Sequence, residues 1–278
     1  MSDQKFNLGI IMGAQFDEAK RWWNFLLLTK FILLFCGIIV VLTGFFTQAF
    51  LWITLFLIIF GSVAQWFTDR NRERAEALLR MEDFWKGLGW KPSVEELSEL
   101  LEPMPVRIRK LIGSDIDRMY FSSKSAYSSR KLMENLVESA WFTKHLARYM
   151  ARYLAIFLAL TILVIISVLL FFMRYYSSPA PDLFDKITQV IIAIIVFLVA
   201  EGWIVLTLNY NQYANNAMQA EYNARKLLNS SNVNEIEAIR TLQEYQLARA
   251  QAPLIPEWLW NRKNKKLNKL WKLEDQFP

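Results

Sequence analysis

Cysteine and histidine are almost missing from this chain of 278 residues, which contains one of each, Cys36 and His145. A single cysteine excludes an intrachain disulfide and a cysteine-based metal site. A single histidine leaves little for histidine-dependent catalysis, and the sequence has no glycine-rich phosphate loop, GxSxG or HExxH motif. Glu138 would share a helical face with His145, but one such pair is no metal site, so we interpret His145 as structural. These absences favour a protein that is not an enzyme and needs neither a metal nor a cofactor.

Long apolar runs are what the sequence does have, since 54% of its residues are hydrophobic although it carries 32 Lys+Arg and 26 Asp+Glu. Soluble domains rarely combine these values, so the apolar residues must be segregated into blocks. Four blocks each supply about the 20 residues that cross a bilayer core of roughly 30 Å. They are residues 25–47, 49–67, 153–173 and 187–208. The sequence therefore predicts four transmembrane helices, the first of them a span and not a cleaved signal peptide, because no small-residue cleavage site follows it.

Basic residues set the expected orientation. Segment 68–152 has 16 Lys and Arg and segment 210–278 has 10, whereas the link TQAF between spans 1 and 2 has none. Because basic residues concentrate on the cytoplasmic side, we expect both termini and both basic segments inside. A receptor or adhesin needs a larger outer surface than the short loop between spans 3 and 4, so control should come from the cytoplasm.

The polar segments are predicted to be helical too. Residues 69–90 continue span 2 without a breaker until Gly87 and Gly89, and 128–157 run without Gly or Pro into span 3. Ser93, three residues before Glu96, forms a capping-box pattern, and further helices are expected over 232–252 and, from Pro256, over 255–275.

The expected fold class is therefore an all-α membrane protein with four transmembrane helices and a cytoplasmic helical domain built from separate pieces of chain. Five parts follow one another along the sequence. They are a cytoplasmic N-terminal segment (1–24), a transmembrane hairpin (25–67), a cytoplasmic helical insert (68–152), a second transmembrane hairpin (153–208) and cytoplasmic C-terminal helices (209–278).

Glu201 lies within the fourth apolar block, in the run IIAIIVFLVAEGWIVLTL. A carboxylate at the centre of a span costs roughly 2.5–3.5 kcal/mol, and such residues face a bundle interior or a water-filled path. One interpretation is a pore or gate residue, whose copies in a symmetric oligomer would form a ring that attracts cations. Gly202 beside it permits close helix approach. The other interpretation is a structural glutamate, paired for instance with Lys30.

Basic residues interleaved with aromatic and hydroxyl side chains mark the 68–152 insert. This mixture suits an anionic ligand with stackable rings, such as a nucleotide or oligonucleotide. The alternative is that the charges set membrane topology or bind lipid. The candidate ligand-binding residues are Arg107, Arg109, Lys110, Lys124, Tyr127, Arg130 and Lys131.

The C-terminal run WLWNRKNKKLNKLWKL has a basic amphipathic pattern with tryptophan anchors. By default such a helix lies along anionic lipid headgroups. Packing between helices of an oligomer and nucleic-acid contact are the alternatives. The residues expected to make these contacts are Trp258, Trp260, Arg262, Lys263, Lys266 and Trp271.

Three stretches, GAQFDEAKRWW (13–23), ENLVESAWFTKHL (134–146) and RTLQEYQLARAQAPLIPEWLW (240–260), carry a family resemblance. They resemble the SMODS-associated four-transmembrane effectors of bacterial anti-phage defence, and the order of spans and insert is similar over most of the chain. The matching positions are Ala14, Gln15, Ala19, Lys20, Arg240, Gln243 and the run PEWLW from Pro256 to Trp260, while Tyr245 and Arg249 match at approximate spacing.

The resemblance implies a pore-forming effector in the bacterial inner membrane, encoded beside a nucleotidyltransferase whose nucleotide product controls it. Opening of the pore would depolarise the membrane and arrest growth.

Three functional hypotheses follow. The first is a homo-oligomeric ion channel whose span 4 lines the axis because of Glu201; four helices are too few to enclose a channel, which favours an oligomer such as a tetramer. The second is a non-conducting membrane anchor or scaffold for a soluble partner. The third, a small transporter, is disfavoured because the sequence shows no inverted repeat and no Gly- or Pro-interrupted span.

Overall fold

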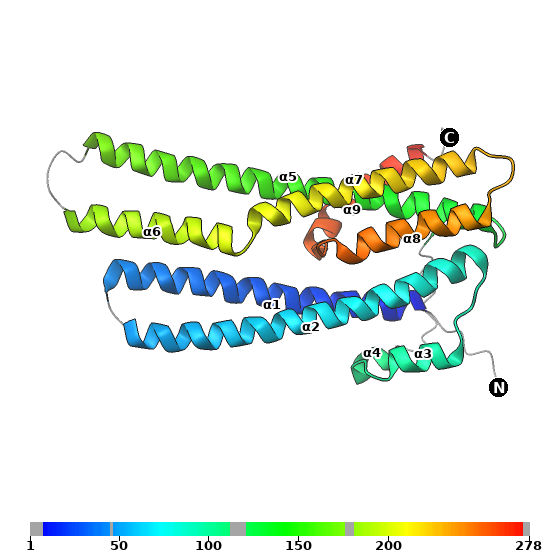
Figure 1. Ribbon diagram of the computed structural model, residues 1–278, viewed down its shortest axis with the longest axis horizontal. Helices are drawn as coiled ribbons and strands as arrows, with labels where there is room; N and C mark the ends of the chain where they lie inside the picture. The colour runs from blue at the N-terminus through cyan, green and yellow to red at the C-terminus, as the bar shows by residue number, and fades with distance from the viewer. Residues whose placement is uncertain (1–7, 45–46, 112–120, 176–180, 275–278) are drawn as a thin grey trace. The chain divides into compact units, whose positions relative to one another are not determined.

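The chain is helical over nearly all of the residues that its computed structural model describes, which are 8–44, 47–111, 121–175 and 181–274. Within these ranges it forms nine helices and no strand (Figure 1). The helices are α1 (Leu8–Thr43), α2 (Thr47–Leu88), α3 (Val94–Leu101), α4 (Val106–Arg109), α5 (Ser129–Tyr175), α6 (Pro181–Ala200), α7 (Trp203–Leu228), α8 (Glu235–Gln251) and α9 (Glu257–Glu274).

Four helical stretches are long and apolar enough to cross a membrane, as predicted. They are Leu8–Thr43, Gln48–Leu88, Ser129–Arg174 and Phe184–Leu228. Each is far longer than the roughly 20 residues that a bilayer requires, because a polar helical extension continues the apolar part. The expected extension of span 2 into 69–90 and of 128–157 into span 3 is confirmed by α2 and α5.

Local signals fix several of the helix ends. α2 stops where Gly89 adopts φ +78°, a conformation that glycine reaches without steric cost. The capping box at Ser93 is confirmed: its side chain accepts from the Glu96 N–H, and the Glu96 side chain accepts from the Ser93 N–H. The first hairpin differs from expectation, because α1 ends before Gly44 at φ +68° and TQAF already belongs to α2.

The chain divides into two compact units, each assembled from separate segments. The apolar unit contains residues 22–66 and 149–209, and the polar unit contains residues 1–21, 67–148 and 210–278. These divisions lie within four residues of the expected span ends. In the apolar unit large side chains such as Phe35, Phe56 and Leu163 are more than half exposed, which is the pattern of helices that face lipid.

The polar unit has two hydrophobic clusters of its own. In one, Leu8 and Ile11 from α1 pack with Leu78 from α2 and Ile108 from α4. In the other, residues of α5, α7 and α8 pack together around fully buried side chains. These are Leu132, Met133, Leu136, Ala217, Leu242 and Tyr245, among others.

α2 and α5 lie close together at Gly87 in the polar unit. A Cβ at this position would lie 2.3 Å from Leu132 Cδ1 and 3.0 Å from Leu132 Cα. The clash includes backbone, so rotation of one side chain cannot relieve it. Gly13 of α1 offers a contrast, because a Cβ there would meet no atom within 4 Å.

We therefore expect Gly87→Ala to lower the free energy of unfolding by about 1–3 kcal/mol, the cost of overpacking a core. Gly13→Ala is the matched control and should raise it by up to about 1 kcal/mol, since alanine is the better helix former. Thermal unfolding of the purified protein in detergent measures both. Equal stability of the two variants would contradict the close packing of α2 against α5.

Candidate functional site

The fourth span is interrupted at Glu201 and Gly202. α6 ends at Ala200, and the Gly202 N–H donates to the Val199 carbonyl at 3.0 Å, three residues back instead of four. Gly202 adopts φ +65°, and α7 begins at Trp203. The expectation of an unbroken span over 187–208 is wrong, because a left-handed glycine ends one helix and opens the next.

Aromatic packing surrounds the break. The Trp203 ring lies 5.9 Å from Phe31, 5.5 Å from Phe157 and 6.4 Å from Phe197, between ring centroids. Its indole N–H is buried and has no hydrogen-bond partner among the described residues. The first N–H groups of α7 likewise have no partner within their own helix, so the break exposes polar donors inside an apolar unit.

Lys30 of α1 neutralises Glu201. Its Nζ lies 2.5 Å from Glu201 Oε2, and the side chains are 30% and 22% exposed. The pairing that the sequence offered as the structural interpretation of Glu201 is therefore present. The attraction between the two charges offsets part of the free energy of placing each of them in an apolar environment.

The Lys30–Glu201 pair borders a hollow of about 390 Å³ in the apolar unit. Polar side chains on its wall come from α1 and α2. Thr29 Oγ1 donates to the Phe25 carbonyl at 2.8 Å and Ser62 Oγ donates to the Ile58 carbonyl at 2.9 Å, which leaves both oxygens able to accept. The full lining is Leu26, Thr29, Lys30, Leu33, Leu57, Ile58, Gly61, Ser62, Gln65 and Glu201.

This polar wall was missed from the sequence, since Thr29, Ser62 and Gln65 are unremarkable one at a time in an apolar run. The available signal was their spacing, which puts Ser62 and Gln65 on one side of α2. Gly61 contributes by its size: a Cβ there would touch Leu26 and Thr29 at 3.7 and 3.8 Å, so α1 and α2 lie close. The hollow therefore combines oxygen acceptors with one charged pair, a setting that suits water and small ions.

The candidate nucleotide residues fall into two sets. Arg107, Arg109 and Lys110 belong to α4 and its end, and Lys124, Tyr127, Arg130 and Lys131 lie at or just before the start of α5. No hydrogen bond or ion pair joins the two sets in the described part of the chain. We find no contact that would assemble all seven into one site.

Several of these residues already have partners. Arg107 pairs with Glu18, Arg130 Nε lies 3.4 Å from Glu134, and Lys131 Nζ lies 4.8 Å from the centre of the Tyr127 ring. Arg109, Lys110 and Lys124 are exposed and form no ion pair with any described residue. These three are the basic side chains most available to an external anion.

The hydroxyls between the basic residues are bound internally. Ser123 and Ser125 donate to Glu134 Oε2 at 2.6 and 2.7 Å, and Ser122 donates to Glu138 at 2.8 Å. Glu138 is thus a partner of Ser122.

The His145 ring meets the Trp141 ring edge to face, with 4.4 Å between the ring centroids, and burial lowers the pKa of the His145 imidazole. No cluster of three or more possible metal ligands occurs among the described residues.

The C-terminal helix α9 packs within its own unit and runs alongside α7. Near its start the Tyr210 hydroxyl donates to the Leu254 carbonyl at 2.5 Å, and at its end Arg225 donates to Glu274 at 2.7 Å. Tyr210 and Arg225 are about 22 Å apart along α7. α9 therefore follows α7 over most of its length.

Tryptophans of α9 contribute to that packing. Trp271 lies 5.3 Å from Trp141, and Trp260 lies 5.9 Å from Phe142 of α5. Trp258 is 49% exposed, and Arg262 and Lys266 are exposed beside it while Lys263 is half-buried. The inner face of α9 is a packing face, and contact with anionic lipid stays a prediction for the outer face.

A buried ionic cluster joins α2 to α8 in the polar unit. Arg249, 8% exposed, donates to Glu76 at 2.9 Å and to Asp83 at 3.2 Å, and Gln246 donates to Asp83 at 3.0 Å. Arg72 donates to carbonyls at the end of α8, those of Arg249 and Ala250, at 3.1 and 2.7 Å. Gln246 and Arg249 belong to the stretch that carries the family resemblance, and here they are structural.

Burial and charge act in opposite directions within this cluster. Burial raises the pKa of Asp83, and the Arg249 guanidinium and the Gln246 amide counteract only part of the rise. Burial alone would lower the pKa of Arg249, but the carboxylates of Asp83 and Glu76 outweigh it and raise the pKa above its ordinary value. Arg249 therefore stays charged, and its carboxylate partners are stabilised by it.

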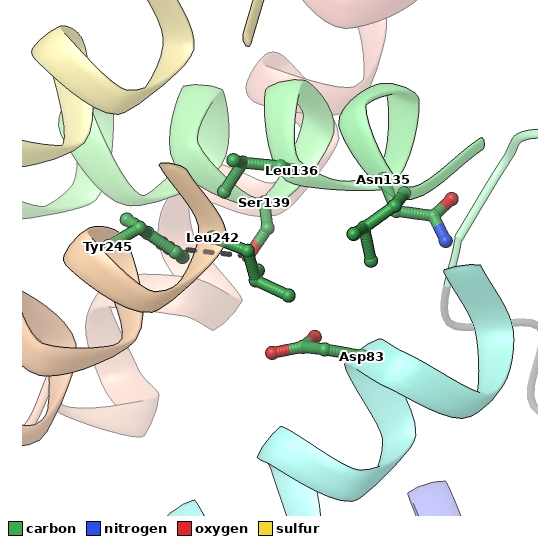
Figure 2. A pocket seen from close by; sticks show the side chains of 7 residues that line it. Asp83, Asn135, Leu136, Ser139, Leu242 and Tyr245 are labelled. Atoms are coloured by element: carbon green, nitrogen blue, oxygen red, sulfur yellow. Dashed lines mark hydrogen bonds between the residues drawn. The ribbon is translucent and has the colours of Figure 1, made fainter. Parts of the chain in front are cut away.

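A second cavity lies beside Asp83 but is far too small for a nucleotide. Figure 2 shows it between Asp83 of α2, Ser139 of α5 and Leu242 and Tyr245 of α8. Its volume of about 10 Å³ matches at most one water molecule. The Tyr245 hydroxyl is shared with Ser139 at 3.3 Å and with Thr143 at 2.9 Å. This cavity belongs to the polar core.

The Lys30–Glu201 pair can be tested by exchanging the charges at the two positions and measuring the stability of the variants. Lys30→Glu or Glu201→Lys alone should lower the free energy of unfolding by about 3 kcal/mol or more, because each sets like charges against each other in an apolar setting. The double exchange should recover most of the loss. Thermal unfolding in detergent measures it, with Arg240→Glu as the control at the exposed Arg240–Glu244 pair, where a change below about 0.5 kcal/mol is expected. A double variant no more stable than the single ones would contradict the pairing.

No protein-family model matches the sequence, and neither a curated protein nor a solved structure matches it. Membership of the defence-effector family therefore stays a prediction.

Proposed function

We propose that this protein is a homo-oligomeric ion channel of the bacterial inner membrane, with both termini in the cytoplasm, and that a cytoplasmic nucleotide or oligonucleotide gates it. The proposed biological role is that of the SMODS-associated four-transmembrane effectors, in which the pore depolarises the membrane and arrests growth of an infected cell. A partner nucleotidyltransferase would supply the signal, and a tetramer is the favoured assembly.

One observation carries the proposal: the fourth span is broken at a charged residue that borders a polar hollow. Continuous apolar helices suffice for an anchor, which has no use for a lysine and a glutamate within its spans. A helix break with a left-handed glycine, two charges and two hydroxyls in the same place is costly in an apolar unit. This cost is expected where ions or water must pass.

The pairing of Glu201 supports a proposed role for this residue in the closed channel. With Lys30 Nζ at 2.5 Å, most of the attraction of the Glu201 carboxylate for a cation is cancelled. Opening would then separate the pair and present Glu201 to the pathway, so the energy of the pair contributes to the closed state. Gly202 supplies the backbone freedom that such a movement needs.

Long helices supply the route from ligand to gate. α2 and α5 each run from the apolar unit into the polar unit without interruption. A rigid helix transmits rotation or translation at one end to the other. The exposed Arg109, Lys110 and Lys124 lie in the polar unit, on the segment between these two helices, where a bound anion would act on both.

An interrupted span also favours a second candidate, a small transporter. Its expected architecture has broken helices at corresponding positions of two halves. Span 2 corresponds to span 4 in this arrangement, and α2 passes through it without a break. The channel is therefore preferred, and a non-conducting anchor is the remaining alternative because the Lys30–Glu201 pair can also be purely structural.

Ion flux from liposomes that contain the purified protein tests the channel directly. We expect cation flux in the presence of an activating nucleotide, or on its removal, with cyclic dinucleotides and short oligoadenylates as probes. Glu201→Gln should lower the ratio of cation to anion flux about tenfold, a change of roughly 1.4 kcal/mol, because Lys30 is left as an uncompensated positive charge; the ratio does not depend on how often the channel opens. Glu244→Gln on the exposed face of α8 is the control and should conduct as wild type does.

Absence of flux under every condition, from protein that is folded and oligomeric, would contradict the channel and favour the anchor. Flux that saturates with substrate concentration and needs a counter-ion would favour the transporter.

A separate binding measurement tests the ligand site. Replacement of Arg109, Lys110 and Lys124 by Ala should weaken binding of a labelled nucleotide more than tenfold without changing oligomer size, because these exposed side chains can supply charge-assisted hydrogen bonds to phosphate. The control replaces Lys265, Lys266 and Lys269 of α9 by Ala, which removes the same charge elsewhere. Equal loss in both variants would mean that general positive charge, and not these residues, attracts the nucleotide.

A further inference from the structure

The outer face of α7 carries an unusual line of side chains. Val205 and Leu208 are followed along the same face by Gln212, Asn215, Gln219 and Tyr222, and every one of these six is exposed. We refer to these six residues as the amide seam. Successive members are three or four residues apart in strict alternation, the spacing of the a and d positions of a heptad.

The amide seam contains no charged residue, whereas the exposed faces of α8 and α9 in the polar unit do. Between Gly202 and Ala220 the sequence contains no Asp, Glu, Lys or Arg. The exposed face of α8, by contrast, carries Glu235, Glu237, Arg240 and Glu244, and that of α9 carries Arg262, Lys265, Lys266 and Lys269. An ordinary solvated face resembles α8 or α9, with a charge at nearly every turn.

The amides are also poor choices for a helix that merely faces water. Seven of the fifteen residues from Asn209 to Asn223 are Asn or Gln, and each Asn costs roughly 0.7 kcal/mol relative to Ala in a helix. Gln212 and Asn215 form no hydrogen bond with any described residue of the chain. Gln219 donates to Asn223 at 2.9 Å. The amide groups of Gln212 and Asn215 are therefore available to another molecule.

A contact between symmetry-related copies would account for this composition. Near the axis of a rotational oligomer each residue meets its own copies, so a charge there meets the same charge. A carboxamide has both a donor and an acceptor and can hydrogen-bond to another carboxamide or through water. The amide seam is thus complementary to itself, whereas the faces of α8 and α9 are not.

We propose that the amide seam is the surface through which copies of this chain meet, with the α7 helices packed side by side around the symmetry axis. The inference rests on the homo-oligomer of the proposed function and adds which helix forms its contact. Because the seam begins at Val205 and Leu208, in the last part of the fourth span, the contact would run continuously from the span into the polar unit. The heptad spacing predicts neighbouring α7 helices that cross at about +20°.

Cysteine cross-linking of the full chain in native membranes tests the seam. In a Cys36→Ser background, Gln212→Cys, Asn215→Cys and Gln219→Cys are introduced singly, each at an exposed position. Gln243→Cys is the matched control, an exposed amide on α8. With a short bismaleimide we expect covalent dimers from the seam cysteines, at least tenfold more than from Gln243→Cys; the products stop at the dimer because each chain carries one thiol.

Two outcomes would overturn the seam. One is cross-linking at Gln243→Cys as strong as at the seam. The other is no cross-linking at seam cysteines that a monofunctional maleimide labels. Native mass spectrometry of the same protein separates this failure from that of the proposed function: an oligomer without seam cross-links rejects only the seam, whereas a monomer rejects both.

A charge-insertion variant provides an independent test. Asn215→Lys places identical charges opposite each other near the axis and should shift the protein to smaller species at low ionic strength, with recovery at high salt. Gln243→Lys adds the same charge on α8 and should leave the oligomer unchanged. Unaltered size of Asn215→Lys at low salt, or an equal shift for Gln243→Lys, would contradict the seam.

Discussion

The ion pair between Lys30 and Glu201 is the constraint around which the apolar unit is built. Either charge alone would be expensive in a helix that faces lipid, and together they require α1 to lie against the end of α6 with Nζ and Oε2 at 2.5 Å. That proximity in turn positions the rings of Phe31, Phe197 and Trp203 against one another. The pair, the aromatic cluster and the adjacent hollow form one connected feature.

In the polar unit, too, buried charges are paired across helices. Arg249 crosses from α8 to α2 and satisfies two buried carboxylates, and Arg72 returns from α2 to the carbonyls that end α8. Buried charges of this kind depend on partners with fixed geometry, so they define which face of α8 meets α2. The helices are thereby held in register, a condition that any transfer of motion through α2 requires.

Much of the architecture could be predicted from the sequence because the relevant signals are local. Apolar runs of span length, the capping box at Ser93 and the glycine after α2 each depend on a few neighbouring residues, and each is present as expected. For Glu201 the sequence left two interpretations open, pairing with Lys30 or a position in a pore. Nothing local distinguishes a paired glutamate from one that faces a pore.

The polar wall and the break could not be predicted because they depend on contacts between distant segments. Thr29 and Ser62 form part of the polar wall only because α1 lies beside α2 in the folded chain. Gly202 lies in a run that reads as one continuous apolar helix, and helix propensity alone cannot tell a tolerated glycine from one with positive φ. The nucleotide candidates illustrate the converse: clustered in the sequence, they divide into two sets, and several are engaged by neighbours such as Glu18 and Glu134.

The left-handed conformation of Gly202 has a consequence for where charge can be displayed. If the fourth span were one unbroken helix, position 201 would lie on the same face as Val205 and Leu208, because it comes four residues before Val205. Glu201 would then join the same line of side chains. The single residue at φ +65° rotates the carboxylate away from that line and toward Lys30. Other L-residues would pay roughly 1–2 kcal/mol for this conformation. The electrostatic character of the fourth span is thus selected by one backbone dihedral angle.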